Sequence, residues 1–313
     1  MIYNRNKKRG SIMNAKTCDH CNNESIVHLA YANRNLCQQH FFNLIEKRFS
    51  FCLRQEGMKP KQRVAVALSG GKDSTTLLYL LNKLKSKIPM DIFAITIDEG
   101  IAGYRPKSIE KAAIMCKKLG IEHHIVKFSS EVGKSLDEIM EDKDDEPACS
   151  YCGVFRRYLL NKAAKELNAD LIAVGHNLDD TAQTIFMNLL RNEPSRILRF
   201  FKPIIEPEDF VRRIKPLMYI PEKEIAIYAI LKGLEFDDGE CPYAMRSIRY
   251  YIRDMINKLE DKKPGAKFQI VKSMLSLLYE KEQNNVNPQV NTIQKNKEKP
   301  EKLDNDKKSE YTN

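Results

Sequence analysis

The stretch VAVALSGGKDSTTLLYLL, residues 64–81, decides the fold. Its first six residues form an apolar run that predicts a buried β-strand, and the residues from Ser74 onward predict a helix. The loop LSGGKDS (68–74) then lies at the carboxyl end of a parallel strand, where open α/β sheets bind their ligands. Gly70 and Gly71 permit a tight turn and close approach of the backbone to an anion, toward which the helix directs its free N–H groups. The stretch therefore predicts a phosphate-binding loop.

The polar side chains of this loop suit a nucleotide with its metal ion. Lys72 adds a positive charge, Ser69 and Ser74 add hydroxyl groups, and Asp73 beside a phosphate is placed as a Mg²⁺ ligand. The spacing differs from G-x-x-x-x-G-K-[ST], so this is not a Walker loop. The alternative is an ordinary Gly-Gly turn with a serine cap, and the flanking strand and helix argue against it.

Strands and helices alternate beyond this loop. Apolar strands are predicted at 91–98, 123–128 and 170–175, and helices at 106–120, 153–168 and 179–191. The alternation indicates an α/β fold with a parallel sheet covered on both faces. Helices alone follow, at 222–233, 246–260 and 266–282. The predicted organisation is a basic arm (1–16), a Cys/His module (17–52), a sheet domain (60–220), a helical region (221–283) and a disordered tail (284–313).

Composition and charge narrow the class of protein. The chain has 313 residues, 42% of them hydrophobic, and no apolar run approaches the roughly 18 residues that span a bilayer. The first thirteen residues are basic with no apolar stretch behind them, so we expect no secretory signal, no membrane partner and a cytoplasmic location. Half of the net charge of +10 comes from Arg5, Lys7, Lys8, Arg9 and Lys16. Such an arm is typical of a segment that binds a polyanion, although a solvated terminus has the same composition.

Cysteines near the N-terminus have the spacing of a metal site. Cys18-x-x-Cys21 is followed by Cys37-x-x-His40, a strong tetrahedral zinc pattern. Eight cysteines without a secretory signal favour metal or sulfur chemistry over disulfides. His20 and His28 are further candidates for zinc ligands. Cys52 and Cys116 lie within apolar helical patterns and are predicted to be core thiols.

Three further cysteines form a second group. Cys149 and Cys152 make another C-x-x-C pair, and Cys241 stands in the segment ECPYA. On spacing alone the pair can hold a cluster or a zinc ion, or act as a redox couple. Three thiolates suit a 4Fe–4S cluster with one iron left open, because a complete protein site uses four.

Two motifs resemble those of one known family. SGGKDS (69–74) after a buried strand, together with GHNLDDTAQT (175–184), resembles the PP-loop ATP pyrophosphatases, with their adenine nucleotide alpha hydrolase-like fold, over residues 60–245. The resemblance implies cleavage of ATP between its α and β phosphates and activation of a carbonyl oxygen as an adenylate. For Asp179 and Asp180, capping of a helix is the alternative. The implied ATP contacts are Ser69, Gly70, Gly71, Lys72, Asp73, Ser74, Gly175, His176 and Asp179.

The second cysteine group is similar to that of the tRNA 2-thiolation branch of this family. Cys149 and Cys152, followed by Arg156 and Arg157, resemble its C-x-x-C-G-x-x-[KR]-R segment, and Cys241 resembles its third cysteine. The resemblance implies a 4Fe–4S cluster on these three cysteines, whose open iron holds a sulfide. A persulfide on Cys149 or Cys241 is the alternative. The implied catalytic residues are Cys149, Cys241, Asp73 and Lys72.

The N-terminal module also matches this branch, in which zinc on Cys18, Cys21, Cys37 and His40 helps to engage tRNA. Members commonly carry a second zinc module after the segment PGAKFQIVKS (264–273), but no cysteine follows that segment here. A tRNA contact through such a second module, and the exact position that is modified, are therefore left open.

The stretch between Arg191 and Lys215 is rich in basic residues, with Phe200 and Phe201 among them. This composition predicts RNA contacts through phosphates and stacked bases. A solvated charged face is the alternative, because acidic residues such as Glu193 are mixed in. The candidate RNA-binding residues are Arg156, Arg157, Arg191, Arg196, Arg199, Arg212, Arg213, Arg246 and Arg249.

The expected function is that of a tRNA-uridine 2-sulfurtransferase that uses ATP, Mg²⁺, a 4Fe–4S cluster and Zn²⁺, acts on the wobble uridine (position 34) and forms a homodimer. Uridine 54 and cytidine are alternative targets within the family. The alternative outside the enzymes is a non-catalytic, zinc-bearing RNA-binding scaffold. An intact SGGKDS motif and the three cysteines argue against it, because a scaffold would need neither. The sulfur donor stays open among free sulfide, a desulfurase and a ubiquitin-like thiocarboxylate protein.

Overall fold

The computed structural model describes residues 16–141, 148–201, 210–244 and 247–286. The chain divides into two units, one up to Val271 and one from Lys272 onward. Of the second unit, the described part is the carboxyl-terminal portion of α11 (Ala266–Val286). The predicted tail beyond Val286 and most of the predicted basic arm lie outside the described residues.

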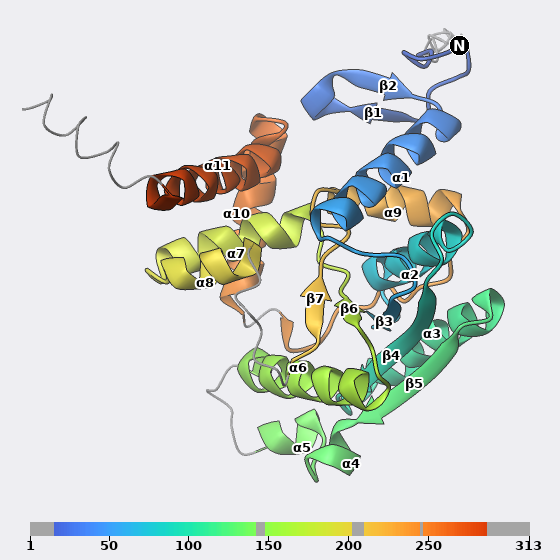
Figure 1. The fold of residues 1–313 in the computed structure, drawn as a ribbon, viewed down its shortest axis with the longest axis vertical. Coiled ribbons are helices and arrows are strands. Elements are labelled where there is room, and N and C mark those ends of the chain that lie inside the picture. The colour runs from blue at the N-terminus through green and yellow to red at the C-terminus, as the bar shows by residue number, and fades with distance from the viewer. Residues whose placement is uncertain (1–15, 142–147, 202–209, 245–246, 287–313) are drawn as a thin grey trace, which may run out of the picture. The chain divides into compact units, whose positions relative to one another are not determined.

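Within the described residues, a five-stranded sheet forms the centre of the first unit (Figure 1). Its strand order is β5-β4-β3-β6-β7, and every pair in it is parallel. The α/β fold with a parallel sheet that the sequence predicted is thereby confirmed. The strands are β3 (Arg63–Ala67), β4 (Asp91–Asp98), β5 (Glu122–Lys127), β6 (Leu171–Ala173) and β7 (Arg212–Ile214).

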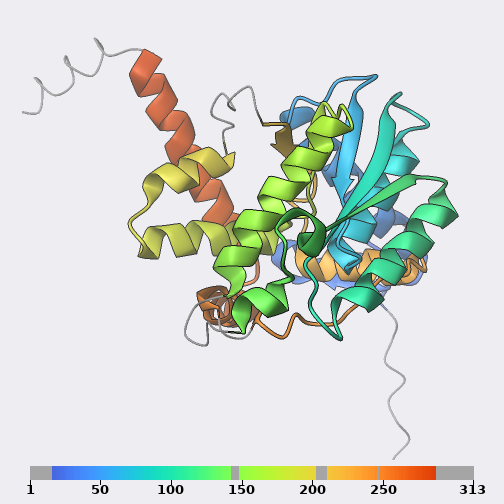
Figure 2. The ribbon, with the colours of Figure 1, turned by 90° about the horizontal axis from the view of Figure 1, so that it is seen from below.

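Alternating side chains of the strands divide the core into two layers, as the two-residue period of a strand requires. Val64 and Val66 of β3 belong to one cluster, whereas Ala65 between them belongs to the other. The first cluster includes α1, α2, α3 and α9, and the second includes α6 with the short helices α4 and α5. Helices therefore cover both faces of the sheet (Figures 1 and 2).

Most predicted helices are present with small shifts of their ends. On the first face lie α1 (Gln38–Gln55), α2 (Lys72–Leu84), α3 (Arg105–Leu119) and α9 (Glu222–Leu231). On the second lie α4 (Phe128–Glu131), α5 (Leu136–Met140) and α6 (Ala148–Glu166). The remaining helices are α7 (Leu178–Leu190), α8 (Pro194–Phe201), α10 (Ile248–Lys262) and α11.

The Cys/His module is a β-hairpin followed by a helix. Strands β1 (Val27–Leu29) and β2 (Arg34–Leu36) pair antiparallel around the short helix η1 (Ala30–Ala32), and α1 follows directly. Phe41 and Phe42 of α1 are buried in the same cluster as the sheet, and the Phe42 ring meets Tyr228 of α9 at 5.1 Å. The module thus shares its core with the sheet.

A polar contact ties this module to α9 as well. The Tyr31 hydroxyl donates to buried Glu224 at 2.6 Å, and Arg48 of α1 pairs with the same carboxylate at 2.8 Å. Because the ion pair is buried and hydrogen-bonded on both sides, loss of one partner would strand a charge in the core. The module and α9 are therefore held together by polar contacts as well as by packing.

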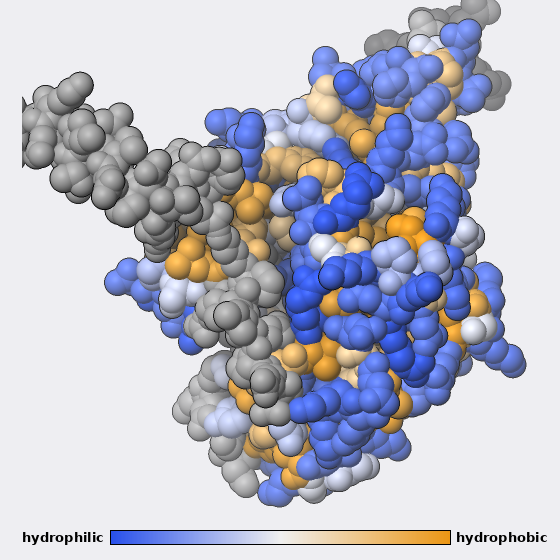
Figure 3. All heavy atoms as spheres, viewed as in Figure 1, coloured by the Kyte–Doolittle hydropathy of each residue, from blue (hydrophilic) through white to orange (hydrophobic). Residues whose placement is uncertain are grey.

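The surface drawn in Figure 3 is mostly hydrophilic, with hydrophobic side chains in separate small areas. Among the described helices, none is both long and apolar enough to cross a bilayer. Cys52 and Cys116 are buried, and burial raises the pKa of each thiol to about 12, as suits the core thiols that the sequence predicted.

Candidate nucleotide, cysteine and zinc sites

The predicted phosphate loop connects β3 to α2, as expected. Gly70 has φ +88°, and a Cβ atom on it would lie 1.9 Å from the carbonyl oxygen of Ser108, so only glycine fits. The Ser69 and Ser74 hydroxyls lie 2.9 Å apart, and the Ser69 N–H donates to Ser74 Oγ at 3.1 Å. The loop is thus closed by its own side chains while the N-terminus of α2 stays directed at it.

Lys72 and Asp73 lie at the start of α2 in a small charged network. The Lys72 ammonium is 2.6 Å from Glu222 and 3.1 Å from Asp73, and Asn177 donates to Asp73 at 3.1 Å. Burial raises the pKa of Asp73, and the charge of Lys72 opposes that shift. Asp73 remains an ionisable oxygen ligand at the mouth of the loop, which fits the hard-cation chemistry expected of Mg²⁺.

The second motif, GHNLDDTAQT, lies against the loop. A Cβ on Gly175 would come within 3.1 Å of the Ser74 nitrogen, so the two segments touch through their backbones. Asn177 caps α7 in a capping box with Asp180, at 3.0 and 3.2 Å. Asp180 thus has the capping role that the sequence left open. Asp179 accepts from the Glu222 N–H at 2.8 Å.

His176 projects from this segment and is exposed. Desolvation is the main cause that lowers the pKa of His176, and the cationic charges of Lys215 and Arg249 lower it further. The imidazole is therefore neutral at neutral pH and lies among basic side chains. Its contact with ATP stays a prediction.

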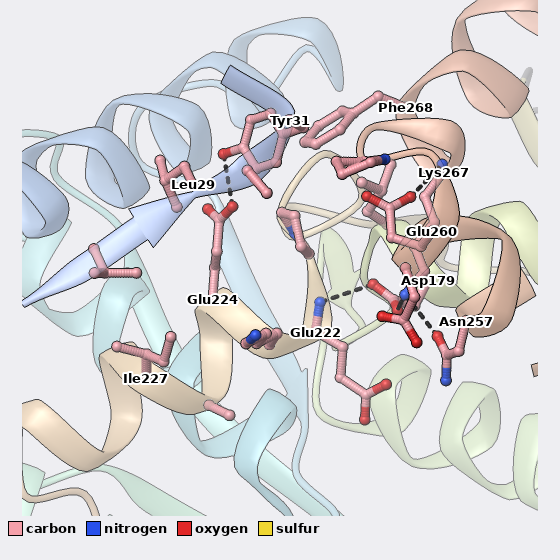
Figure 4. Close-up of a pocket in the computed structure, with 18 of the residues that line it drawn as sticks. Leu29, Tyr31, Asp179, Glu222, Glu224, Ile227, Asn257, Glu260, Lys267 and Phe268 are labelled. Carbon is pink, nitrogen blue, oxygen red and sulfur yellow. Dashed lines mark hydrogen bonds and ion pairs between the residues drawn. The ribbon is translucent and has the colours of Figure 1, made fainter. Parts of the chain in front are cut away.

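A pocket of about 620 Å³ opens beside Lys72 (Figure 4). Its walls come from the zinc-module hairpin, α9, and the segment from α10 into α11. Asp179 pairs with Lys267 and Glu222 with Lys72, while Glu224 is held by Tyr31. Five carboxylates (Asp179, Glu222, Glu224, Glu260 and Asp261) and three lysines (Lys72, Lys223 and Lys267) line the pocket, so acidic side chains outnumber basic ones there.

The three cysteines of the second group lie near one another. Cys149 is exposed, and Cys152 and Cys241 are partly buried. Burial is the main cause that raises the pKa of Cys152 to about 11, and the charges of Cys241 and Cys149 also raise it. The three thiols are therefore within electrostatic range of each other, in a group open to solvent at Cys149.

This group is joined to the phosphate loop through the backbone before Cys241. The Asp237 N–H donates to the Gly70 carbonyl at 2.9 Å, and Asp237 forms a parallel bridge with Gly71. Only three residues separate Asp237 from Cys241. The segment that leads to Cys241 is therefore bound directly to the phosphate loop.

The four predicted zinc ligands form a compact group, and it is the one such group found among the described residues. Their ligand atoms all lie within 4.8 Å of one another. Cys21 Sγ is 3.7 Å from Cys37 Sγ, and His40 Nδ1 lies 3.3–3.5 Å from the three sulfurs. Tetrahedral zinc with Zn–S of about 2.3 Å and Zn–N of about 2.05 Å requires separations of about 3.8 and 3.6 Å. The residues fit zinc.

The spare histidines are not part of this group. His28 Nδ1 lies 3.0 Å from the Asn35 side-chain oxygen, and the His20 ring stands 5.1 Å from that of His40. At Cys37, the backbone N–H of His40 is the main cause that lowers the pKa to about 6, which favours the thiolate that zinc binds.

Loss of one zinc ligand is expected to weaken the whole first unit. Cys37→Ser should release the metal and lower the melting temperature by about 5 °C or more, because α1 belongs to the core of the sheet. Metal analysis and calorimetry measure both effects. His28→Ala is the matched control and should keep its zinc. Wild-type protein that binds no zinc would refute the ligand assignment.

The predicted RNA-binding arginines divide into two sets. One set surrounds Arg157. Burial is the largest cause that lowers the pKa of Arg157, and the positive charges of Arg213, Arg156 and Arg196 lower it further, so these three lie within electrostatic range of it. Among the described residues, none forms an ion pair with Arg157 or Arg213. A group of like charges of this kind suits phosphates.

The other arginines have different surroundings. Arg212 donates to the Glu56 carbonyl at 2.7 Å, and Arg249 joins α10 to α7 through Asp180, Gln183 and Thr184. These two contacts serve the fold, so an RNA contact is not needed to explain either residue. Arg191 is exposed at the end of α7. Arg246 lies outside the described residues, as does the side chain of Arg199.

Four residues of this site were missed by sequence reasoning: Glu99, Arg105, Glu222 and Asp237. Each has a contact with a segment far away in the chain: Glu99 with Arg156, Arg105 with Ser69, Glu222 with Lys72, and Asp237 with Gly70. The sequence did hold a pattern that could have identified Glu99. The segment DEG (98–100) stands at the carboxyl end of a predicted parallel strand, where ligand sites form.

Comparisons with known proteins agree with this geometry. Residues 36–260 match the family described as a PP-loop domain, and residues 17–42 match the N-terminal LIM domain of the 2-thiouridine synthetase TtuA. The tRNA 2-thiolation protein NcsA of Haloferax volcanii is 38% identical over 81% of this chain and 84% of its own. The tRNA-5-methyluridine(54) 2-sulfurtransferase of Pyrococcus horikoshii is 36% identical over 82% and 81%.

A solved structure is also similar, that of the U34-tRNA thiolase NcsA from Methanococcus maripaludis with its [4Fe-4S] cluster. It has a TM-score of 0.76 and 38% identity, and the match covers 84% of this chain and 87% of that one. The family match covers well over half of the chain, and both the loop and the N-terminal module agree with it. The chain belongs to the PP-loop family, in its branch of tRNA 2-thiolation proteins.

Proposed function

We propose that the protein is an ATP-dependent tRNA-uridine 2-sulfurtransferase that acts on uridine 34. The observation that carries the proposal is the bond from Asp237 to Gly70, because it joins the phosphate loop to the segment of Cys241. Activation and sulfur transfer can then take place on one base without its release. The solved relative named a U34 thiolase favours position 34, whereas one sequence relative is named for position 54.

In the first step the uridine O2 attacks the α-phosphorus of ATP, the bond to the bridging oxygen breaks, and pyrophosphate leaves. The loop backbone and the N-terminus of α2 hold the phosphates, and Lys72 moves from Glu222 to a phosphate oxygen. Asp73 would hold Mg²⁺, which neutralises the charge that builds on the departing oxygens.

In the second step sulfur forms a bond to C2 of the uridine, the C2–O bond breaks, and AMP leaves. A 4Fe–4S cluster, when bound, supplies an iron with a free position for sulfur, and Cys149, Cys152 and Cys241 would hold it. All three are free thiols that are exposed or partly exposed. Arg156 lies within electrostatic range of Cys152 and would supply a positive charge for the leaving AMP.

A pyrophosphate-release assay with bulk tRNA tests the function. Wild-type protein should release pyrophosphate only when ATP, Mg²⁺ and tRNA are all present, because the attacking oxygen belongs to the tRNA. Release without tRNA would point to another acceptor, and no release at all would favour the non-catalytic scaffold.

The arginine group predicts the tRNA surface. The double substitution Arg157→Ala and Arg213→Ala should weaken tRNA binding about tenfold and reduce the salt slope by about 2, since each arginine neutralises one phosphate. Filter binding at several salt concentrations measures both quantities. Arg54→Ala, on the exposed end of α1, is the control and should change neither. An unchanged salt slope in the double variant would remove this surface from the proposal.

A further inference from the structure

Glu99 and Arg105 form a buried ion pair between the phosphate loop and the cysteine group. Both side chains are about 95% buried, and Arg105 Nε lies 2.6 Å from Glu99 Oε2. Glu99 directly follows β4, and Arg105 begins α3, so the pair closes the short loop between them. Because removing two charges from water costs free energy, a buried ion pair often stabilises a fold no better than apolar side chains of the same size would. Stability alone therefore does not explain this pair.

The Arg105 guanidinium faces the phosphate loop. It donates to the carbonyls of Ser69 at 3.1 Å and of Ile97 at 2.5 Å, and to the Ser108 hydroxyl at 2.9 Å. Ser69 begins the loop, and the Ser108 carbonyl lies directly against Gly70. Arg105 therefore holds both the first residue of the loop and the helix turn that packs on it.

The other oxygen of Glu99 faces the cysteine group. Glu99 Oε1 lies 3.7 Å from Arg156 Nη1, and Cys152 and Cys241 are within electrostatic range of the same carboxylate. The Arg156 side chain is 55% exposed while that of Glu99 is 5% exposed, so a buried carboxylate pairs with an exposed cation. The backbone of Glu99 is fixed, since its carbonyl accepts from the Leu136 N–H at 2.7 Å.

We propose that Glu99 is a positioning residue for the second step of the reaction: its ion pair with Arg105 anchors it beside the phosphate loop, and its second oxygen holds Arg156 beside the cysteines. The inference rests on the proposed function, because it assigns a role in the second step of that function. Both steps act on one base, so the loop and Arg156 must keep their spacing, and an error of about 1 Å costs about a hundredfold in rate.

The test is Glu99→Gln, which keeps the shape of the side chain and removes its charge. Arg105 keeps its three other acceptors, whereas Arg156 loses its ionic partner. We expect pyrophosphate release to stay within about twofold of wild type, in iron-loaded and in iron-free protein, while 2-thiouridine formed per pyrophosphate falls about tenfold.

Two further variants serve as rescue and control. Glu99→Asp restores the charge but shortens the side chain by one carbon, so it should recover only part of the 2-thiouridine formed per pyrophosphate. Glu131→Gln removes a carboxylate that pairs with Lys162 and contacts neither Arg105 nor Arg156 among the described residues, and should change neither rate. Iron per chain should equal that of wild type in all of these variants, because none of them removes a cysteine.

If the melting temperature of Glu99→Gln shows that this variant does not fold, Arg156→Gln is used in its place. It breaks the same contact from the exposed side and leaves the buried pair intact. At saturating tRNA it should lower 2-thiouridine per pyrophosphate by a similar factor. An unchanged ratio in both variants, or an equal fall of both rates in Glu99→Gln, overturns the proposal. Absence of pyrophosphate release in wild-type protein would instead overturn the proposed function.

Discussion

Cys241→Ser is expected to lower 2-thiouridine formation by about 10³-fold or more and to remove iron from anaerobically purified protein, which should carry about four iron atoms per chain when intact. Cys149→Ser and Cys152→Ser should have the same effect, because a cluster on three thiolates has no spare ligand. Pyrophosphate release should persist, since the phosphate loop lies on β3 and α2. Iron analysis and mass spectrometry of tRNA nucleosides measure the two losses.

The matched control is Cys116→Ala, which removes a buried thiol packed in the core beside the sheet. It should retain its iron and its thiolation activity. Full thiolation by an iron-free, chelator-treated wild-type protein would contradict the cluster and favour a persulfide on Cys149 or Cys241. The raised pKa of Cys152, about 11, makes that thiol a weak nucleophile without a metal.

Asp73→Asn is expected to lower pyrophosphate release by about 10²-fold or more, the scale of one lost preorganised electrostatic group. The asparagine can still accept from Asn177, and Lys72 keeps Glu222, so the fold of the loop should survive. ATP affinity should fall only modestly, and tRNA affinity should not change. Single-turnover pyrophosphate release and filter binding measure these quantities separately.

Asp254→Asn is the control for this substitution, because Asp254 pairs only with Lys258 on the exposed face of α10 among the described residues. It should release pyrophosphate at the wild-type rate. If Asp73→Asn did the same, the loop would not be the catalytic site, and the scaffold interpretation would gain support.

Local patterns account for what the sequence predicted well. The bounds of β4 agree with the predicted strand at 91–98, because its apolar run is bounded by aspartates on both sides. The zinc ligands were predicted as a set because two short pairs each place their ligands within a few residues. The phosphate loop was predicted for the same reason, since strand, turn and helix follow one another directly.

Short or long-range features account for what was missed. Strand β7 has three residues, two of which are arginines, so the segment gave no apolar run and was interpreted as an RNA contact. Helix α6 spans Ala148–Glu166 rather than residues 153–168, which places Cys149 and Cys152 within its first two turns. Contacts such as Lys72 with Glu222 join residues 150 positions apart, and no local spacing predicts them.

The most direct test of the account is mass spectrometry of nucleosides and mapped fragments from tRNA incubated with iron-loaded protein, ATP, Mg²⁺ and sulfide. The account predicts 2-thiouridine at position 34, formed only when ATP is present, and absent with Asp73→Asn and with Cys241→Ser. Thiolation that continues without ATP or with Asp73→Asn, or tRNA that gains no sulfur from wild-type protein, would contradict it.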